Sequence, residues 1–253
     1  MSERGDMRGL RVRDLGRMPY RAAWALQKEL LQARLAGTAP DTLLLVEHEP
    51  VITLGRGTKG EFLASGVRRA CAAPGDATDA AFVELPGGAR AEVVEVERGG
   101  QATYHGPGQL VAYPIVKLRE GRRDLHAWMR ALEQAVIDTL GGSGFATEAA
   151  PVAGRPAAGR KPGATGVWID GERKLCSIGV AASRWVTWHG LALNVDPDLS
   201  HFAAINPCGL PSAVMTCVEI EARAWSVSGS DLAARLAGHL DRQAASFREP
   251  AGG

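Results

Sequence analysis

The sequence predicts an α+β fold, built as a mixed β-sheet sandwich with flanking helices. Three observations lead to this class. The 253 residues suit one domain spanning residues 1–253. Hydrophobic residues make up 45% of the chain, which is enough to bury a sizeable core. Strand-like and helix-like segments follow one another without the regular strand–helix–strand rhythm of a parallel α/β fold, so we expect a mixed sheet.

The first part of the chain predicts one helix among three strands. Residues 10–15 are short and strand-like, and Pro19–Leu35 has apolar residues spaced mostly by three or four, as in an amphipathic helix. Gly37 ends that pattern. Thr42–Val46 is a compact apolar run typical of a buried strand, and Val51–Leu54 predicts the next strand after a short bend.

The middle of the chain predicts two strands and a second helix. Residues 64–80 are small and rich in Ala, which indicates a surface excursion. Ala91–Glu97 alternates apolar and acidic residues, as a half-buried strand does, and Leu110–Leu118 is another strand candidate. Asp124 is a suitable N-cap for a helix that continues to Leu140, because one face of that segment is apolar.

The last part predicts a hairpin, a strand and a closing helix. Residues 149–164 are nearly all Ala, Gly, Pro, Arg and Lys, so we expect a flexible loop there. Two strand-like runs flank Asp170-Gly171, which is a strong hairpin signal. The remaining predicted segments are the hairpin strands Thr165–Ile169 and Arg173–Ala181, the strand Leu191–Val195 and the helix Ser230–Phe247. The short termini are predicted to be disordered.

Charge and composition exclude several classes of function. There are 29 basic and 28 acidic residues and no basic block, so the electrostatic signature of a nucleic-acid binder is missing. No segment approaches the roughly 18 apolar residues that a membrane-spanning helix needs. The N-terminus carries charges of both signs and has no apolar core, unlike a signal peptide. We therefore expect a cytoplasmic protein without a membrane partner.

The four cysteines predict neither a disulfide framework nor a metal site. They are few for a chain of this length and include no close CxxC pair. A zinc trio of His201, Cys208 and Cys217 is conceivable, but no ligand spacing supports it.

One glycine motif resembles a dinucleotide-binding turn. Gly55–Gly60 fits G-x-G-x-x-G and follows a predicted strand. The helix that should follow would have to lie between Glu61 and about Ala70 with Gly66 inside it, which is too short for the usual crossover. No P-loop motif is present. The sequence therefore argues against dinucleotide binding.

The segment Arg98–Gln109 is the densest candidate for a binding loop. Its four glycines and one proline fix an unusual backbone path along which the chain can approach a ligand closely. The alternative is a tight connection whose polar residues face water. The polar pair His189-Gly190 lies directly before a predicted strand and offers a second cluster of this kind.

Cys208 is the candidate nucleophile and Lys174 its candidate partner. Pro207 and Gly209 constrain the chain on either side of Cys208, so its thiol can be accessible, as a reactive cysteine must be; the alternative is an inert loop cysteine. Lys174 shares a predicted strand face with Cys176, Ile178 and Val180. Most such lysines lie at a sheet edge, but a buried one can act as a base or stabilise a thiolate. The remaining cysteines, Cys71, Cys176 and Cys217, are predicted to be small apolar fillers.

Four of these motifs, in this order and at these separations, resemble the lipoyl(octanoyl) transferases of lipoate biosynthesis. They are Arg98–Gln109, Lys174–Gly179, His189–Asn194 and Ile205–Gly209. The likeness extends from about Leu10 to Phe247. Glu47–Arg56 also resembles an early strand pair of that family, which accounts for the apparent dinucleotide motif.

The resemblance implies a biotin/lipoate protein ligase-like catalytic domain that transfers an octanoyl group through an acyl-cysteine thioester. The donor would be octanoyl-acyl carrier protein, and the acceptors would be lysines of lipoyl domains of 2-oxoacid dehydrogenase complexes and of the glycine cleavage H protein. No cofactor, metal or ATP is implied, because thioester exchange is nearly balanced and amide formation is downhill. We expect a monomer.

The resemblance also implies residue roles. Cys208 would be the nucleophile and Lys174 the residue that lowers its pKa. The implied acyl-binding residues are Arg98, Gly99, Gly100, Gln101, Ala102, Thr103, Tyr104, His105, Ser177, Ile178, Gly179, Gly190, Leu191 and Ala192. Val152–Thr165 departs from the family by being longer and richer in Gly and Ala.

Two other functions are alternatives to acyl transfer. An ATP-dependent lipoate or biotin ligase of the same superfamily does not use a cysteine nucleophile, so Cys208 in its Pro-Cys-Gly bend argues against it. A non-catalytic module that binds acyl groups or lipoyl domains would have no need of the intact Lys174 and Cys208 pair.

Overall fold

The computed structural model describes most of the chain. The described residues are 9–58, 63–64, 69–70 (backbone only), 81–205, 214–223 and 225–249. Cys71, Cys208, both extreme termini and most of the excursion at 64–80 lie outside the described residues.

Eight strands form a large mixed sheet. Its order is β1-β2-β8-β13-β12-β11-β10-β9. β1 pairs with β2 and β9 with β10 in parallel, and the other neighbours are antiparallel. The strands are β1 (Arg11–Met18), β2 (Thr42–His48), β8 (Gln109–Ile115), β9 (Ala146–Thr147), β10 (Ala157–Lys161), β11 (Ala164–Ile169), β12 (Arg173–Ser183) and β13 (Val186–Asn194).

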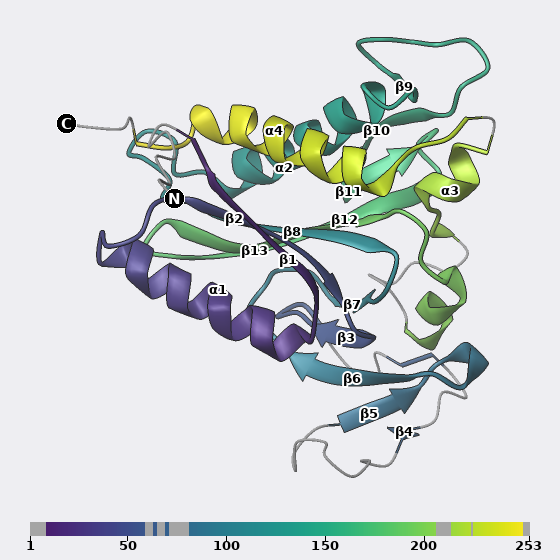
Figure 1. Cartoon of the computed structure of the whole chain (residues 1–253), viewed down its shortest axis with the longest axis horizontal. Helices are drawn as coiled ribbons and strands as arrows, with labels where there is room; N and C mark the ends of the chain where they lie inside the picture. Colours follow the sequence, from purple (N-terminus) through teal and green to yellow (C-terminus); the bar gives the residue numbers. More distant parts are fainter. Residues whose placement is uncertain are drawn as a thin grey trace, which may run out of the picture.

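A second sheet, with five strands, lies beside the large one (Figure 1). Its order is β4-β5-β6-β3-β7, and only β3 and β6 pair in parallel. The strands are β3 (Val51–Leu54), β4 (Arg69–Ala70), β5 (Ala81–Glu84), β6 (Arg90–Glu95) and β7 (Ala102–His105). Of these, β4, β5 and β7 were not predicted.

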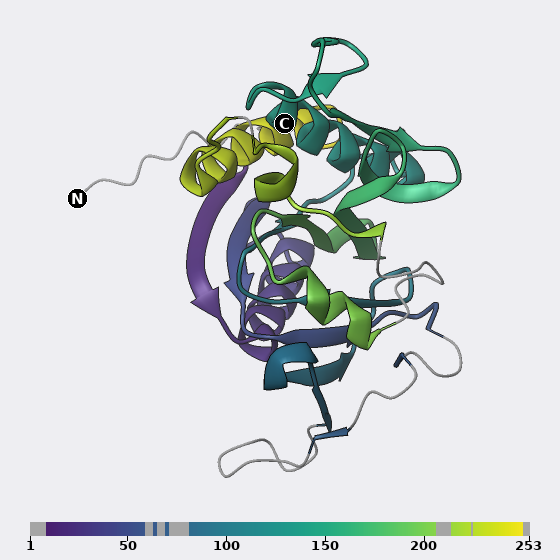
Figure 2. The same cartoon turned by 90° about the vertical axis from the view of Figure 1, so that its right-hand side faces the viewer.

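Helices cover both faces of the large sheet. α2 and α4 lie side by side on one face, and α1 lies on the other (Figures 1 and 2). The helices are α1 (Tyr20–Leu35), α2 (Leu125–Gly141), α3 (Val218–Glu221) and α4 (Gly229–Ala245), with 3-10 helices η1 (Pro86–Gly88) and η2 (Leu199–Ala204). Among the described residues, no helix is both long and apolar enough to cross a membrane.

The apolar faces of the helices explain this layering. The larger core cluster joins α2 and α4 to the sheet and includes Trp128, Leu132, Leu236 and Leu240, all buried. A second cluster packs α1 against the opposite face. The predicted α+β class with a mixed sheet and flanking helices is confirmed.

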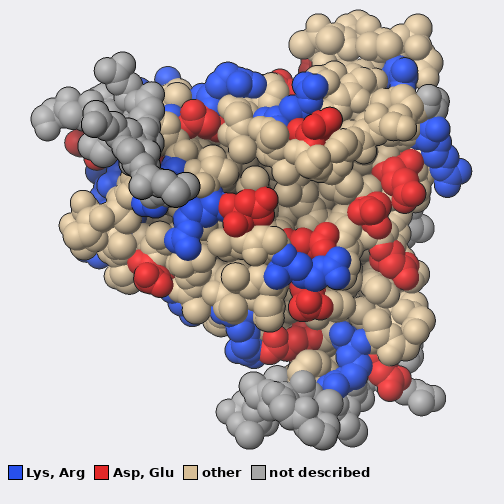
Figure 3. Space-filling model, in the orientation of Figure 1, with Lys and Arg blue, Asp and Glu red and all other residues tan. Residues whose placement is uncertain are grey.

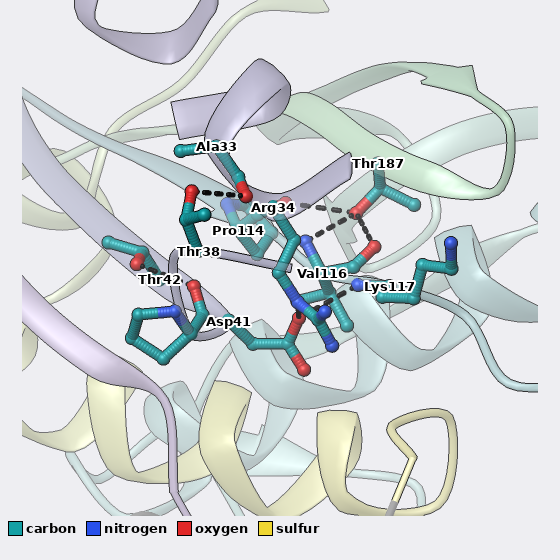
Figure 4. A network of polar contacts seen from close by, with 10 residues as sticks. Ala33, Arg34, Thr38, Asp41, Thr42, Pro114, Val116, Lys117 and Thr187 are labelled. Atoms are coloured by element: carbon teal, nitrogen blue, oxygen red, sulfur yellow. Dashed lines mark hydrogen bonds and ion pairs between the residues drawn. The ribbon is translucent and has the colours of Figure 1, made fainter. Parts of the chain in front are cut away.

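A polar network fixes the C-terminal end of α1 to the sheet (Figure 4). Asp41 Oδ1 accepts hydrogen bonds from Arg34 Nε at 2.7 Å and from the Lys117 amide at 2.9 Å. Both partners of the ion pair are largely buried, so it holds α1 against the start of β2 and the end of β8.

Two local predictions are confirmed in detail. Asp124 caps α2 by accepting from the amides of His126 and Ala127, an interaction typically worth about 1 kcal/mol. Asp170 and Gly171 have φ values of 52° and 70°, which are the two left-handed residues that a type I′ hairpin between β11 and β12 requires.

The segment 149–164 differs from the flexible loop that we expected. Its second half forms β10, which pairs with β9 and β11. Composition misleads here because the ladder uses backbone groups, which Ala and Gly provide as well as any residue. Arg160 adds a tie to α2, since its Nε donates to Glu133 at 3.0 Å.

Basic and acidic side chains lie interspersed over the surface drawn in Figure 3, without a large area of one sign. On this face the arrangement agrees with the nearly balanced composition of 29 basic and 28 acidic residues.

Candidate functional site

A pocket lies between the two sheets, next to the N-terminal end of α1. β8, β12 and β13 of the large sheet form one side, and β7 with the turn before it forms the other. The pocket encloses about 680 Å³, including solvent at its mouth. It is lined by Tyr20, Arg98–Thr103, His105, Tyr113, Lys174, Ser177–Gly179, His189–Ala192, Val214 and Met215.

The structure places most of the described residues of the predicted site around one pocket. Every predicted acyl-binding residue except Tyr104 lines this pocket, and so does Lys174. Three segments separated by about 70 and 10 positions in the sequence therefore converge on one space. The contributing residues are Arg98, Gly99, Gly100, Gln101, Ala102, Thr103, His105, Ser177, Ile178, Gly179, Gly190, Leu191 and Ala192.

The exception, Tyr104, points to the opposite side of β7. Thr103 and His105 line the pocket, and successive side chains of a strand alternate in direction. Tyr104 is instead buried in the core of the small sheet, where its hydroxyl is 2.9 Å from His201 Nδ1. Tyr104 therefore lies outside the pocket that the other predicted acyl-binding residues line.

Arg98 lines the pocket, but its guanidinium is used by the protein backbone. Nη1 donates to the carbonyls of Gly99 and Gln101 at 3.1 and 2.8 Å, and Nη2 donates to the carbonyl and hydroxyl oxygens of Thr53 at 2.7 and 2.8 Å. Arg98 thus holds the glycine turn in place. A side chain at Gly55 would collide with the Gly100 carbonyl, so close packing explains that glycine without a dinucleotide.

Lys174 is buried, and a β-bulge determines where its side chain goes. Two residues of β12 lie opposite one of β11, because Lys174 pairs with Trp168 and Cys176 with Val167. The extra residue, Leu175, shifts the alternation of side chains. Lys174 consequently lines the pocket, while Cys176 belongs to the core. The predicted shared face of Lys174 and Cys176 is wrong for this reason.

The two described cysteines are unsuited to nucleophilic chemistry. Cys176 is fully buried, and burial raises the pKa of its thiol to about 12. Cys217 is buried at the start of α3, and burial also raises its pKa. Both match the prediction of apolar fillers, although Cys217 occupies the N-cap position of α3, without a side-chain capping hydrogen bond, and does not lie in a strand. Val214 and Met215, six and seven positions after Cys208, line the pocket.

A group of aromatic and imidazole side chains forms one wall, of which the sequence did not predict Tyr20 and Tyr113. Tyr20 stacks on His105, with ring centroids 6.1 Å apart. The Tyr113 hydroxyl lies 2.8 Å from His48 Nε2, while His48 Nδ1 lies 3.0 Å from the Met18 carbonyl. Since a carbonyl only accepts, His48 Nδ1 carries the proton and Tyr113 donates to Nε2. Helical and strand periodicity cannot separate residues that face a pocket from residues that face a core.

His189 is the most unusual member of this wall. Its φ of 56° lies in the left-handed region, in the middle of β13. The side chain is 1% exposed, and neither ring nitrogen has a hydrogen-bond partner. The His189-Gly190 pair was the signal in the sequence, and Gly190 is required because a side chain there would collide with the Ala112 carbonyl.

Burial keeps His105 and His189 of this wall, and the neighbouring His48, neutral. It lowers the pKa of His48 to about 4 and that of His189 to about 3, and it lowers the pKa of His105 well below the ordinary value. Nearby cations, including Arg98, lower the last two further. Among the described residues, no group of His, Cys, Asp and Glu could hold a metal ion.

These pKa values predict that the protein loses stability in mild acid. Between about pH 6.5 and 4 these histidines bind protons in the unfolded chain but stay neutral in the folded protein. The free energy of unfolding therefore falls as pH falls. We expect each of the three histidines to lower the free energy of unfolding by about 1 to 2 kcal/mol between pH 7 and 5. Urea denaturation at a series of pH values measures the slope of the free energy of unfolding against pH. His48→Gln should flatten it, and His126→Gln, at an exposed position, should not; a flat profile in the unaltered protein would contradict the assignment.

Comparison with known proteins identifies related sequences. The family described as lipoyl protein ligase A/B catalytic domain matches residues 19–239. An octanoyltransferase of Solibacter usitatus is 46% identical over 218 residues, covering 86% of each chain. An octanoyltransferase of Geobacter metallireducens is 43% identical over 205 residues, covering 81% of this chain and 80% of the relative.

Solved structures share the fold at low sequence identity. A lipoate-protein ligase A bound with ATP superposes with a TM-score of 0.60 at 16% identity, covering 92% of this chain and 85% of that one. A bipartite lipoate protein ligase from Thermoplasma acidophilum gives 0.59 at 17% identity, covering 95% and 86%. A biotin protein ligase from Leishmania major gives 0.52 at 14% identity, covering 94% and 76%. These similarities extend to the fold alone.

Proposed function

The chain belongs to the lipoyl protein ligase A/B catalytic domain family and is an acyltransferase that transfers octanoyl groups in protein lipoylation, and from this premise we propose how it does so. Cys208 accepts the octanoyl group from acyl carrier protein as a thioester. Lys174 prepares the thiol for attack. The acyl-enzyme then passes the group to a lysine of a lipoyl domain.

The convergence of the predicted acyl-binding residues on the pocket that holds Lys174 carries this proposal. Ile178, Leu191, Ala192, Val214 and Met215 supply apolar surface to that pocket, which suits an acyl chain. Lys174 lines the same pocket and is buried, so a cationic or basic group is available to act on a neighbouring thiol. The described cysteines, Cys176 and Cys217, are enclosed in the protein.

The proposed reaction balances without a cofactor. The Cys208 thiol transfers its proton toward Lys174, and the sulfur attacks the carbonyl carbon of the donor thioester. The bond from that carbon to the carrier sulfur breaks, and the carrier leaves as a thiol with the proton. The acceptor amine next attacks the acyl-cysteine, a C–N bond replaces the C–S bond, and Cys208 regains a proton. The amide is the more stable product, so no ATP is consumed.

We assign the acceptors by the same proposal. They are lipoyl domains of 2-oxoacid dehydrogenase complexes and of the glycine cleavage H protein, with octanoyl-acyl carrier protein as the donor. The enzyme would act in the cytoplasm as a monomer. A lipoyl domain is named beside the ligase in the Thermoplasma acidophilum structure.

Intact-protein mass spectrometry tests the order of events. The enzyme mixed with octanoyl carrier protein should gain one octanoyl mass and then stall, because closure of the pocket around the chain excludes water. Adding a lipoyl domain should move the mass onto that domain. Neutral hydroxylamine should remove it from the enzyme and not from the domain, since thioesters react and amides do not.

Other outcomes distinguish the alternatives. Steady release of free octanoate without a lipoyl domain, at the rate of transfer, would make the protein a hydrolase. Transfer from free octanoate that requires ATP would make it a ligase. Binding of the lipoyl domain without any mass change in either protein would indicate a non-catalytic module.

A further inference from the structure

A directed chain of hydrogen bonds runs from the pocket to the backbone of Lys174. The amide of Gln109 donates from Nε2 to Asn194 Oδ1 at 3.0 Å and to the Tyr104 carbonyl at 3.3 Å. Gln109 Oε1 is therefore an acceptor, and His105 Nδ1, 3.2 Å away, must carry its proton. All of these side chains are buried.

The series of hydrogen bonds continues into the residues that follow Cys208. Asn194 Nδ2 donates to the Thr216 carbonyl at 2.9 Å. The Thr216 amide in turn donates to the Lys174 carbonyl at 3.0 Å. Met215 forms an isolated parallel β-bridge with Lys174. The downstream flank of segment 206–213 is thus tied both to β12 at Lys174 and to β13 at Asn194.

The upstream flank is tied to the same glycine-rich segment. The Gly108 carbonyl accepts from the amides of Val195 and Asp196, both at 3.0 Å. A Cβ at Gly108 would lie 2.6 Å from Pro197 N, so the chain passes directly over this glycine. Tyr104 then contacts η2, the last element before Cys208, with its hydroxyl on His201 and its ring 5.4 Å from that of Phe202.

We propose that Gln109, Asn194 and Tyr104 are positioning residues that set the geometry between Lys174 and Cys208. This inference rests on the proposed function of those two residues. Gln109 and Asn194 hold the chain after Cys208 against the Lys174 strand, and Tyr104 holds the chain before it. Arg98–Thr103 and His105 of the glycine-rich segment line the acyl pocket, while Tyr104, Gly108 and Gln109 of the same segment serve the nucleophile.

The hydrogen bonds of Gln109 and Asn194 tolerate no change of direction. Each amide both donates and accepts, and each is enclosed by protein. Asn194→Asp replaces the donor with an oxygen that faces the Thr216 carbonyl, and Gln109→Glu does the same toward the Tyr104 carbonyl. Both replacements keep the size of the side chain, so the acyl pocket retains its walls. A buried carbonyl left without its donor shifts to find another partner.

Rates of acylation test the proposal. Octanoyl carrier protein is mixed with each folded variant, and the mass increase of the enzyme is followed over time at several donor concentrations. We expect Asn194→Asp and Gln109→Glu to lower the maximal rate constant between about ten- and a hundred-fold, because small displacements of reacting groups have effects of this size. The donor concentration at half-maximal rate should change less than about three-fold. Tyr104→Phe, which removes one hydroxyl, should lower the rate constant about three- to ten-fold.

Thr139→Val is the matched control. It also removes a buried side-chain hydrogen bond, from Thr139 Oγ1 to the Ala135 carbonyl at 2.7 Å, but within α2 and away from the pocket. It should lower the melting temperature without changing the rate constant. Wild-type rate constants in the two folded amide variants would overturn the proposal, and if they do not fold, a wild-type rate in Tyr104→Phe would overturn it. Failure of the unaltered enzyme to gain the octanoyl mass would instead overturn the proposed function, and this inference with it.

Discussion

Cys208→Ala should abolish octanoyl transfer and the octanoyl mass gain of the enzyme, while Cys71→Ala, Cys176→Ala and Cys217→Ala retain most of the activity. The physical reason is access to a thiolate. The Cys176 thiol is enclosed in the core and has a pKa of about 12, so almost none of it is ionised near neutral pH. Cys217 is also buried. Transfer is measured on a lipoyl domain, and acylation is measured on the enzyme alone.

Cys176→Ala is the most informative control in this set, because Cys176 lies two positions from Lys174 in β12. Removing a buried sulfur leaves a small cavity, so the melting temperature should fall somewhat. Loss of acylation in folded Cys176→Ala, with acylation kept in Cys208→Ala, would contradict the assignment of the nucleophile.

The sequence predicts most strands of the large sheet but misses β9 and β10, and it misses β4, β5 and β7 of the small sheet. α2 and the hairpin at Asp170 carry local signals, a cap and a turn, that act over a few residues. β7 and β10 lie in segments rich in Gly and Ala, and strands of this kind are stabilised by pairing with distant partners. Such pairing leaves no mark within the segment itself.

The site shows the same division between local and distant causes. The glycine-rich and lysine motifs mark the pocket because close approach of backbone requires Gly at defined positions. The bulge at Leu175 reverses the expected direction of Lys174, and no feature of β12 alone reveals it, since it arises from the register with β11. Tyr20 and Tyr113 carry ordinary core periodicity, so their place in the pocket lining is visible only in the folded structure.

The fold by itself does not choose between transferase and ligase chemistry. The ligase bound with ATP superposes over most of this chain at 16% identity, so one scaffold accommodates both reactions. The distinction lies in individual side chains, and the relatives that are 43 to 46% identical over more than four-fifths of this chain are octanoyltransferases. The proposed pairing of Lys174 with Cys208 is therefore the feature that experiments should test first.

Lys174→Met should leave the protein folded and slow the reaction of Cys208 with iodoacetamide at pH 7 by up to about thirty-fold. An ordinary cysteine has a pKa of about 8.5, so only a few per cent of it is thiolate at that pH. Met resembles Lys in length and keeps the apolar contacts of the stem, including the packing beside Trp168, whose ring centroid is 5.5 Å from Lys174 Nζ. Any slowing therefore reports the lost charge or proton acceptor. The reaction is followed by mass in a background of Cys71→Ala, so that alkylation of Cys208 is read alone.

Lys174→Arg separates the two ways in which the lysine can act. Arg keeps the positive charge but does not give up a proton under these conditions. If the side chain works as an ammonium beside the thiolate, Lys174→Arg should retain much of the thiol reactivity; if it works as a base, the variant should resemble Lys174→Met. Equal alkylation rates in the unaltered protein and in Lys174→Met from pH 6 to 9 would refute the partnership, whatever happened to transfer, because a partner that leaves the ionisation of the thiol unchanged does not prepare it for attack.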